Sequence, residues 1–265
     1  MTKNKNLKEI RKFKFFVIHN KDPERKKVIT EELLGNGVFD KDIELIDYPN
    51  KEDLTYNLKK KIVQKKRERH NFGFPNQKGS LKDGWICVSY KHYLAIEKMV
   101  KNKYPLGIII EDNVGTINEN IIETLNKCLD ELPSDWDVLF DSTRAHSFDM
   151  MKEGQVNNKN IVYKKNLGYS FNISGNIIAG GGTKSAQFYM LNFNSAKKLY
   201  DHYLPFNHAP DVWMNELFRH LDFNCYWIEP SITENRKNHT SSTNFEKKLS
   251  YNQIKSKIHN LILGI

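Results

Sequence analysis

The stretch that decides the fold is YPLGIIIEDNVGT, residues 104–116. Its apolar run, residues 106–110, is short and rich in β-branched side chains, which is typical of a buried β-strand. The run ends abruptly in Glu111, Asp112 and Asn113. A buried strand that terminates in two carboxylates and an amide predicts that these polar groups are delivered to one edge of a sheet.

Strands and helices alternate on either side of this stretch. FKFFVIH (13–19) and DIELIDYP (42–49) are predicted strands, and a helix is predicted to begin at Asp22-Pro23 and to end near Leu34. Strand, helix, strand with short links is the pattern of a parallel sheet. We therefore predict an α/β fold, a single Rossmann-type domain with a mostly parallel central sheet flanked by helices. Further predicted elements are helices at 51–70, 86–101, 116–132 (with Thr116 and Glu119 as a capping box) and 209–221, strands at 135–141 and 225–230, an irregular strand-and-loop segment at 143–178, and a glycine loop leading into a strand at 180–192.

The composition predicts a basic globular protein. Apolar residues make up 39% of the 265-residue chain, and the formal net charge of +9 predicts attraction to nucleic acid, a phosphorylated small molecule or a lipid headgroup. Cys87, Cys128 and Cys225 form no C-x-x-C pair, which argues against a zinc knuckle or a disulfide framework and fits a reducing compartment. No apolar run approaches the roughly 18 residues of a membrane span. We expect a soluble cytoplasmic protein, and no nucleic-acid partner because no nucleic-acid-binding motif interleaves the basic residues with aromatics.

The acids at the strand end suggest a ligand site. In open α/β sheets, ligands bind beyond the carboxyl ends of the strands, which is where Glu111, Asp112 and Asn113, together with Asp47 and Asp141, are predicted to lie. Oxygen ligands of this kind suit Mg²⁺ or Mn²⁺, which also hold substrate phosphates. A basic protein with such an edge suggests a diphosphate-bearing substrate. From the spacing alone, an acidic turn after a strand explains the same residues equally well.

Seven short blocks resemble one enzyme family when they are taken in order. They are VIHNKDPER (with Asn20 and Arg25), GWICVSYKH, the Glu-Asp-Asn triplet, LPSDWDVL, SAQFYMLN followed by NSAKKL, APDVWMNELF and WIEPSITEN. Over about residues 13–242 their order and spacing resemble glycosyltransferase family 25, which contains lipooligosaccharide and collagen-type galactosyltransferases of the GT-A fold. Three features depart from the family pattern: Asn113 stands where the family has Asp, the spacing from Cys87 to His92 is one residue longer, and the link between Asn20 and Arg25 is shorter.

The resemblance implies a GT-A-like enzyme that moves a sugar, with a hexose expected, from a UDP-sugar to a glycan, lipid-linked or protein acceptor. It implies an inverting, metal-assisted reaction with Mn²⁺ or Mg²⁺. Asp112, Asn113 and a late histidine, His239, are the expected metal ligands, although a turn-forming amide and an exposed loop histidine are the alternatives for the last two. The expected substrate-binding residues are His19, Asn20, Arg25 (towards phosphate), Asp47, Glu111, Gly182 and Lys184.

The expected general base is Asp211, at the start of a helix, with Glu216 in reserve. A plain helix-stabilising acid is the alternative role for Asp211, a solvated helix charge is the alternative for Arg25, and a flexible turn is the alternative for the glycine run at 180–182. Four aromatic side chains are candidates for sugar stacking, with core packing favoured for each: Trp85, Tyr189, Trp213 and Trp227.

The expected organisation is a basic lead-in at 1–12, a glycosyltransferase domain at 13–242, and an amphipathic helix at 243–265 that packs on the domain. The lysines of that helix leave open a peripheral membrane contact. Two other functions stay open. One is a catalytically weak or inactive binding protein of the same fold, in which Asn113 weakens the metal site. The other is a metal-dependent nuclease or nucleotidyltransferase, which would need a second acid cluster.

Overall fold

The computed structural model describes residues 12–64, 81–117, 120–141, 186–228 and 231–235, together with four short strands between 155 and 179. Three predicted site residues, Gly182, Lys184 and His239, lie outside these ranges. So do residues 1–11 of the predicted lead-in and the whole predicted C-terminal helix at 243–265. The roles assigned to all of these segments stay predictions.

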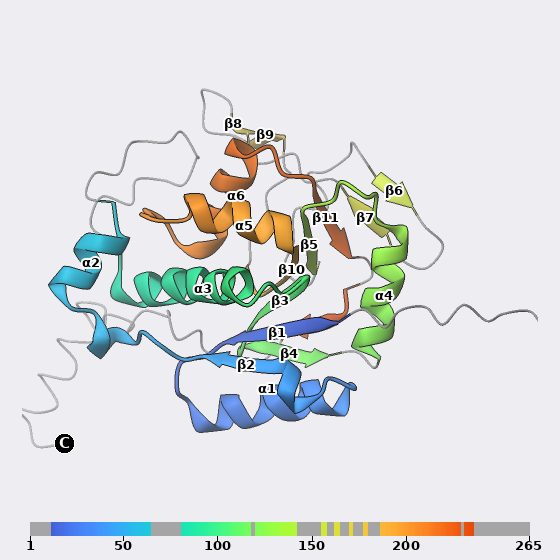
Figure 1. Ribbon diagram of the computed structural model, residues 1–265, viewed down its shortest axis with the longest axis horizontal. Coiled ribbons are helices and arrows are strands. Elements are labelled where there is room, and N and C mark those ends of the chain that lie inside the picture. The colour runs from blue at the N-terminus through green and yellow to red at the C-terminus, as the bar shows by residue number, and fades with distance from the viewer. Residues whose placement is uncertain are drawn as a thin grey trace, which may run out of the picture.

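A six-stranded sheet forms the centre of the protein (Figure 1), and it confirms the predicted α/β fold. Its order is β11-β5-β10-β3-β1-β2. The pairs β2–β1, β1–β3 and β5–β11 are parallel, whereas β10 runs antiparallel to both of its neighbours. The strands are β1 (Phe13–Ile18), β2 (Ile43–Ile46), β3 (Leu106–Glu111), β5 (Val138–Asp141), β10 (Phe188–Asn192) and β11 (Cys225–Ile228).

Helices cover both faces of the sheet because alternate residues of each buried strand point to opposite sides. From β1, Phe16 packs into the core formed with α3, α5 and α6, while Phe15 packs into the core formed with α1 and α4. In Figure 1, α3 and α1 lie on opposite sides of β1. The helices are α1 (Pro23–Gly35), α2 (Tyr56–Ile62), α3 (Asp83–Lys101), α4 (Ile121–Glu131), α5 (Phe193–His202) and α6 (Pro210–His220), with single 3₁₀ turns at Asp40–Asp42 and Lys51–Asp53.

The predicted start of α1 is confirmed. The Asp22 Oδ1 atom accepts hydrogen bonds from the backbone N–H groups of Glu24 (3.0 Å) and Arg25 (3.2 Å), and Pro23 occupies the first helical position, where no N–H is needed. This cap fixes the direction in which α1 leaves β1. As a result, the Arg25 side chain in the first turn is carried back towards the carboxyl end of the sheet.

Two predicted helices differ from the structure. The capping box at Thr116 and Glu119 is wrong: Thr116 lies in a strand, β4 (Val114–Ile117), and α4 is preceded by Asn120. Long-range pairing overrides the local signal, because β4 pairs antiparallel with β12 (Thr233–Asn235), more than a hundred residues away. The predicted helix at 51–70 is interrupted, since a 3₁₀ turn precedes α2 and α2 ends at Ile62; residues 65–80 lie outside the described part.

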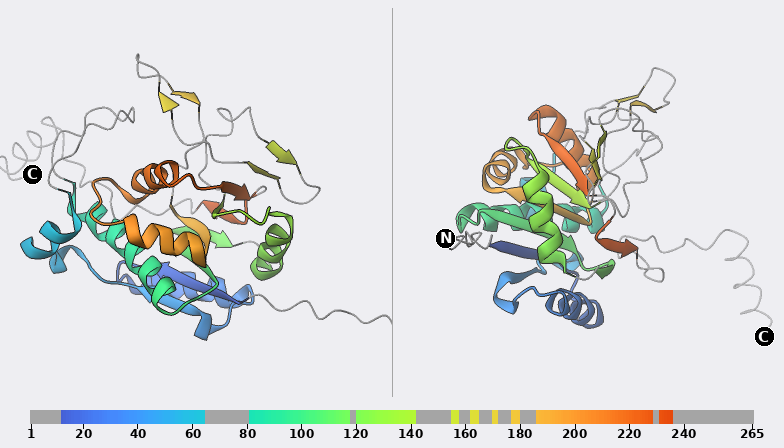
Figure 2. Two further views of the ribbon diagram at one scale, coloured as in Figure 1. Left: turned by 45° about the horizontal axis from the view of Figure 1, so that its top comes forward. Right: turned by 90° about the vertical axis from the view of Figure 1, so that its right-hand side faces the viewer.

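The segment predicted as an irregular strand-and-loop excursion does contain strands. Figure 2 shows two further views of the chain, including these short strands. They form two antiparallel pairs, β6 (Gln155–Asn157) with β7 (Val162–Lys164) and β8 (Ser170–Phe171) with β9 (Ile177–Ala179). Among the helices that the structure describes, none combines the length and the apolar character needed to cross a bilayer.

Candidate functional site

The carboxyl ends of β1 and β3 lie side by side in the centre of the sheet. Ile18 pairs with Glu111 across the two parallel strands, and the backbone N–H of Asp112 donates to the Ile18 carbonyl at 3.0 Å. The chain crosses from β1 to β2 on one side and then to β3 on the other, so strand order reverses at this point. Such a switch point is where open α/β sheets bind ligands. The residues just after each strand therefore form the candidate site.

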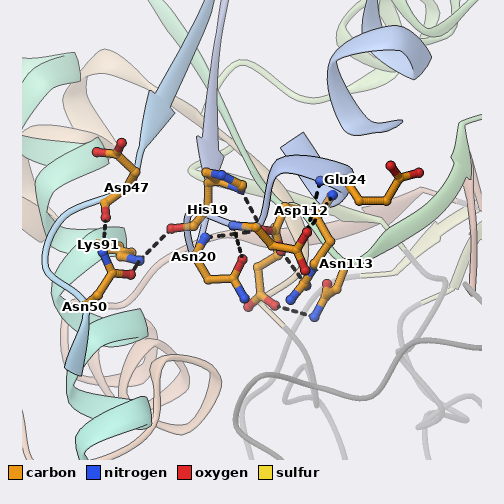
Figure 3. Close-up of polar contacts among 11 residues, drawn as sticks. His19, Asn20, Glu24, Asp47, Asn50, Lys91, Asp112 and Asn113 are labelled. Carbon is orange, nitrogen blue, oxygen red and sulfur yellow. Dashed lines mark hydrogen bonds and ion pairs between the residues drawn. The ribbon is translucent and has the colours of Figure 1, made fainter. Parts of the chain in front are cut away.

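Asp112 is the centre of a buried cluster of charged groups (Figure 3). One carboxylate oxygen is ion-paired with the Arg25 guanidinium. The other lies 2.9 Å from His19 Nδ1 and accepts a longer hydrogen bond, 3.3 Å, from the Asn20 backbone N–H. His19, Arg25 and Asp112 are each at most 5% exposed. The cluster ties the start of α1 and the end of β1 to the end of β3, and it engages both oxygens of Asp112.

A second buried cation, Lys91 of α3, lies on the other side of β1. Its Nζ donates to the His19 backbone carbonyl at 2.5 Å and to Asn50 Oδ1 at 3.0 Å. Asn50 is itself fixed, since its Nδ2 donates to the Asp47 carbonyl at 2.7 Å. Lys91 is 3% exposed, and burial lowers the pKa of its ammonium group. Lys91 thus connects α3, the end of β1 and the loop after β2.

Sequence reasoning missed Lys91, although a signal for it was present. In a helix, residues four apart lie on the same face. Lys91 stands in the row Cys87, Lys91, Ala95 and Met99, and the other three members are buried apolar residues. A lysine in the middle of an otherwise apolar row is predicted to be a buried cation. Burying a charge costs free energy unless a partner compensates it, so such a lysine is a candidate functional residue.

Glu111 and Asn113 form a hydrogen-bonded chain with Gln187, which precedes β10. Asn113 Nδ2 donates to Glu111 Oε2 at 3.0 Å, and Gln187 Nε2 donates to Asn113 Oδ1 at 2.6 Å. The Gln187 backbone carbonyl also accepts from the Glu111 N–H at 2.8 Å. The amide of Asn113 therefore bridges two neighbours, using its oxygen and its nitrogen together. An aspartate in this place could not donate to Glu111.

The other oxygen of Glu111 faces a buried histidine. His92 Nε2 lies 3.6 Å from Glu111 Oε1, while His92 Nδ1 lies 2.9 Å from the Tyr189 hydroxyl. Burial raises the pKa of Tyr189, so its hydroxyl stays protonated and can donate to Nδ1. In that tautomer the Nε2–H of His92 points towards Glu111. Tyr189 is fully buried, so the structure gives it a core role rather than one in sugar stacking.

Asp211, the predicted general base, shares this neighbourhood. It lies in the first turn of α6, where its Oδ1 accepts from the Val212 N–H at 2.9 Å. Burial, followed by the negative charge of Glu111, raises the pKa of Asp211 to about 6. The Ser89 hydroxyl of α3 donates to the His208 carbonyl at 3.2 Å, so the segment that leads into α6 contacts the helix that carries His92. An acid with this pKa is largely ionised at neutral pH and still able to hold a proton.

The described oxygen atoms of the triplet do not form a divalent-cation site as they stand. Asp112 is engaged by Arg25, His19 and Asn20, and the Asn113 oxygen accepts from Gln187. In the ranges that the structure describes, no group of three or more His, Cys, Asp or Glu side chains is arranged to hold a metal ion. Metal binding by Asp112, Asn113 and His239 stays a prediction.

The two other acids predicted at strand ends, Asp47 and Asp141, differ in their surroundings. Asp47 is exposed after β2, and in Figure 3 its carboxylate points away from Asp112. Asp141, at the end of β5, is instead a structural anchor: its carboxylate accepts from the Ile232 N–H (2.9 Å), the Thr233 N–H (3.1 Å) and the Ser231 hydroxyl (2.8 Å). The expectation that Asp141 belongs with the ligand-binding acids is therefore wrong, because its oxygens hold the segment that leads into β12.

The other described aromatic residues considered for sugar stacking are also buried or half-buried in the core. Trp213 is 8% exposed and its Nε1–H donates to the Tyr203 carbonyl at 2.8 Å, which fits core packing. Trp85 is half-buried against the same core, and the side chain of Trp227 lies outside the described part. Sugar stacking by Trp85 or Trp227 therefore stays a prediction.

Comparison with known proteins gives one family match. A family model described as glycosyltransferase family 25 (LPS biosynthesis protein) matches residues 13–214. Solved structures with a related chain trace include a CMP:2-keto-3-deoxy-manno-octonic acid synthetase complexed with CTP (11% identity, 96% of this chain and 99% of that one, TM-score 0.37). Another is mouse xyloside xylosyltransferase 1 in its apo form (12% identity, 80% of this chain and 70% of that one, TM-score 0.32). At TM-scores this low, neither likeness bears on function. No curated protein matches the sequence.

Proposed function

This chain belongs to glycosyltransferase family 25, and from that premise we propose that it moves a hexose from a UDP-sugar to a hydroxyl group of a glycan, glycolipid or glycoprotein acceptor. The matched residues include β1, the Glu111–Asn113 triplet and Asp211. A sugar donor and a glycan acceptor follow from the family in general. The uridine nucleotide, the hexose and inversion at the anomeric carbon are our proposals.

The observation that carries the proposal is the Asp211 carboxylate in the first turn of α6, whose pKa is raised by burial and by the negative charge of Glu111. Glycosyl transfer needs a base for the acceptor hydroxyl, and the most effective base has a pKa near the working pH. Asp211, with a pKa of about 6, meets that condition. Glu111 lies at the carboxyl end of β3, at the switch point where a nucleotide is expected to bind.

The proposed reaction is a single displacement. The acceptor oxygen attacks the anomeric carbon of the donor sugar and passes its proton to the Asp211 carboxylate. The bond from the anomeric carbon to the diphosphate oxygen breaks, and UDP leaves with the electron pair. Attack opposite to the leaving group inverts the configuration. His19, Asn20 and Glu111 are proposed to hold the donor, and the ion pair of Arg25 with Asp112 keeps the loops after β1 and β3 in place.

A divalent cation remains an expectation from the family resemblance. If Mn²⁺ or Mg²⁺ binds, it would neutralise charge on the diphosphate. The described oxygens of Asp112 and Asn113 are already engaged, so we assign no step to a metal ion. The cytoplasmic location and the peripheral membrane contact also remain expectations, and the membrane contact involves the predicted helix at 243–265, which lies outside the described residues.

Nucleotide binding tests the proposal. We expect UDP to raise the melting temperature of the wild-type protein, and GDP, CDP and ADP to do so less, because a ligand that binds only the folded state stabilises it by mass action. Free UDP at about 100 times its Kd should add about 2.7 kcal/mol to the free energy of unfolding. Each nucleotide is measured by thermal denaturation with Mn²⁺ and with EDTA. A folded protein whose melting temperature no nucleotide changes would contradict the proposal.

A further inference from the structure

We propose that the buried ammonium group of Lys91 supplies a fixed positive charge for the diphosphate of the nucleotide donor. This inference rests on the proposed function and deepens it, because it names the side chain that neutralises the leaving group. Neither the sequence analysis nor the family match assigns Lys91 a role.

The partners of Lys91 are neutral. Its Nζ donates to a backbone carbonyl, that of His19, and to a side-chain amide oxygen, that of Asn50. No carboxylate of the described residues pairs with it at contact distance. A charge that is 3% exposed and has only neutral acceptors is costly to keep in the folded protein. An anionic ligand that binds nearby would offset this cost in the ligand-bound protein.

The buried charges around the end of β1 leave a positive surplus. Arg25 and Lys91 are two buried cations. Among the described residues, Asp112 is the one buried carboxylate that acts on Lys91 electrostatically, and its oxygens are engaged by Arg25, His19 and the Asn20 N–H. The Nε atom of Arg25 is buried and makes no hydrogen bond in the described part of the chain. Asp47, the other carboxylate that acts on Lys91 electrostatically, is exposed.

The place of Lys91 matches the place where a donor must bind. Figure 3 shows its Nζ between the His19 carbonyl and Asn50, on the side of β1 opposite to the Asp112 cluster. His19 immediately follows β1, whose neighbour β3 carries Glu111 at the same edge. Arg25 and Lys91 therefore flank the carboxyl end of β1. An anion bound there lies in the field of both cations, inside a region of low dielectric where charge effects are strong.

A diphosphate is the anion that fits best. Transfer of the sugar leaves negative charge on the diphosphate, and a cation positioned in advance stabilises that charge without having to reorganise. Burial lowers the pKa of Lys91, and a bound polyanion favours its charged form again. The backbone amides at the start of α1 are not free for this task, since Asp22 already caps them.

The test separates the charge of Lys91 from its packing. The affinities of uridine, UMP and UDP are measured by titration calorimetry in EDTA for the wild type, for Lys91→Gln and for the isosteric apolar variant Lys91→Met. The matched control is Lys101→Gln, an exposed lysine at the end of the same helix that pairs with Glu97. We expect Lys91→Gln to weaken UDP binding by about tenfold or more, UMP less, and uridine by no more than about twofold, with the control unchanged.

The possible results distinguish the charge of Lys91, its role in packing and the proposed function. An equal loss for all three ligands in both Lys91 variants means that Lys91 only shapes the site and overturns the inference. Unchanged UDP affinity in a folded Lys91 variant also overturns it, while leaving the proposed function intact. If Lys91→Gln does not fold, the affinities of Lys91→Met for uridine, UMP and UDP are used instead, because methionine matches the length of the lysine stem. Wild-type protein that binds no UDP, with or without Mn²⁺, contradicts the proposed function instead.

Discussion

Asp211→Asn is expected to lower kcat by about 10²- to 10⁴-fold, the range typical of the loss of a general base. Asparagine has nearly the same shape but cannot accept the proton of the acceptor hydroxyl. UDP affinity should stay within about twofold of the wild type, because the base contacts the acceptor and not the donor. The measurement is UDP release from a UDP-hexose in the presence of acceptor, together with calorimetric titration of UDP.

The pH dependence provides an independent check on the base. Burial and the charge of Glu111 raise the pKa of Asp211 to about 6. The active form is the carboxylate, so kcat/KM should rise with pH up to about 6 and then level off, and this rise should be absent in Asp211→Asn. Glu216→Gln is the matched control on the same helix and is expected to stay active. If Glu216→Gln abolished turnover and Asp211→Asn did not, Glu216 would be the base.

Asp112→Ala is expected to destabilise the folded protein by about 3–5 kcal/mol, because it leaves a buried guanidinium without its partner. Asp112 joins Arg25 and His19 across elements that are about ninety residues apart in sequence. The free energy of unfolding is measured by urea denaturation in EDTA. If Asp112 served only as a metal ligand, stability in EDTA would be unchanged and only the Mn²⁺-dependent part of UDP binding would disappear.

A double-mutant cycle identifies the pair responsible. Arg25→Met alone should also destabilise the protein, whereas Arg25→Met combined with Asp112→Leu should cost clearly less than the sum of the two single changes, since neither charge is then left alone. The matched control is Asp201→Ala, which removes an exposed ion pair with Lys197 on α5. That change should cost less than about 1 kcal/mol. Additive effects of the Arg25 and Asp112 changes would contradict the account of the cluster.

The sheet was predictable because its signals are local. The apolar run before Glu111 and the Asp22-Pro23 start of α1 each depend on a few adjacent residues, and both are confirmed. His19, Asn20 and Arg25 were expected at the site from the family resemblance, and the structure places them beside Asp112. Family resemblance added Asp211, whose role as the base stays a prediction.

The partners within the site were not predictable, because they come from distant parts of the chain. The sequence pattern makes Asp112 and Asp141 look alike, as acids at strand ends. One is ion-paired with Arg25 and hydrogen-bonded to His19, and the other anchors residues 231–233. Thr116 has the local pattern of a helix cap, yet it lies in β4, whose pairing with β12 overrides that pattern. Local patterns show where polar groups gather, and only the tertiary structure shows which of them are already occupied.

Glycosyl transfer by the wild-type protein is the decisive measurement. Wild-type protein is incubated with UDP-hexoses, with and without Mn²⁺, and with a panel of sugar, glycolipid and glycopeptide acceptors, while UDP release and the glycosylated product are both followed. We expect at least one acceptor-dependent product that forms together with UDP and is absent with Asp211→Asn. Wild-type protein that binds UDP but yields no acceptor-dependent product across the panel would contradict the proposed function, and would identify the chain as a nucleotide-binding protein of the same fold.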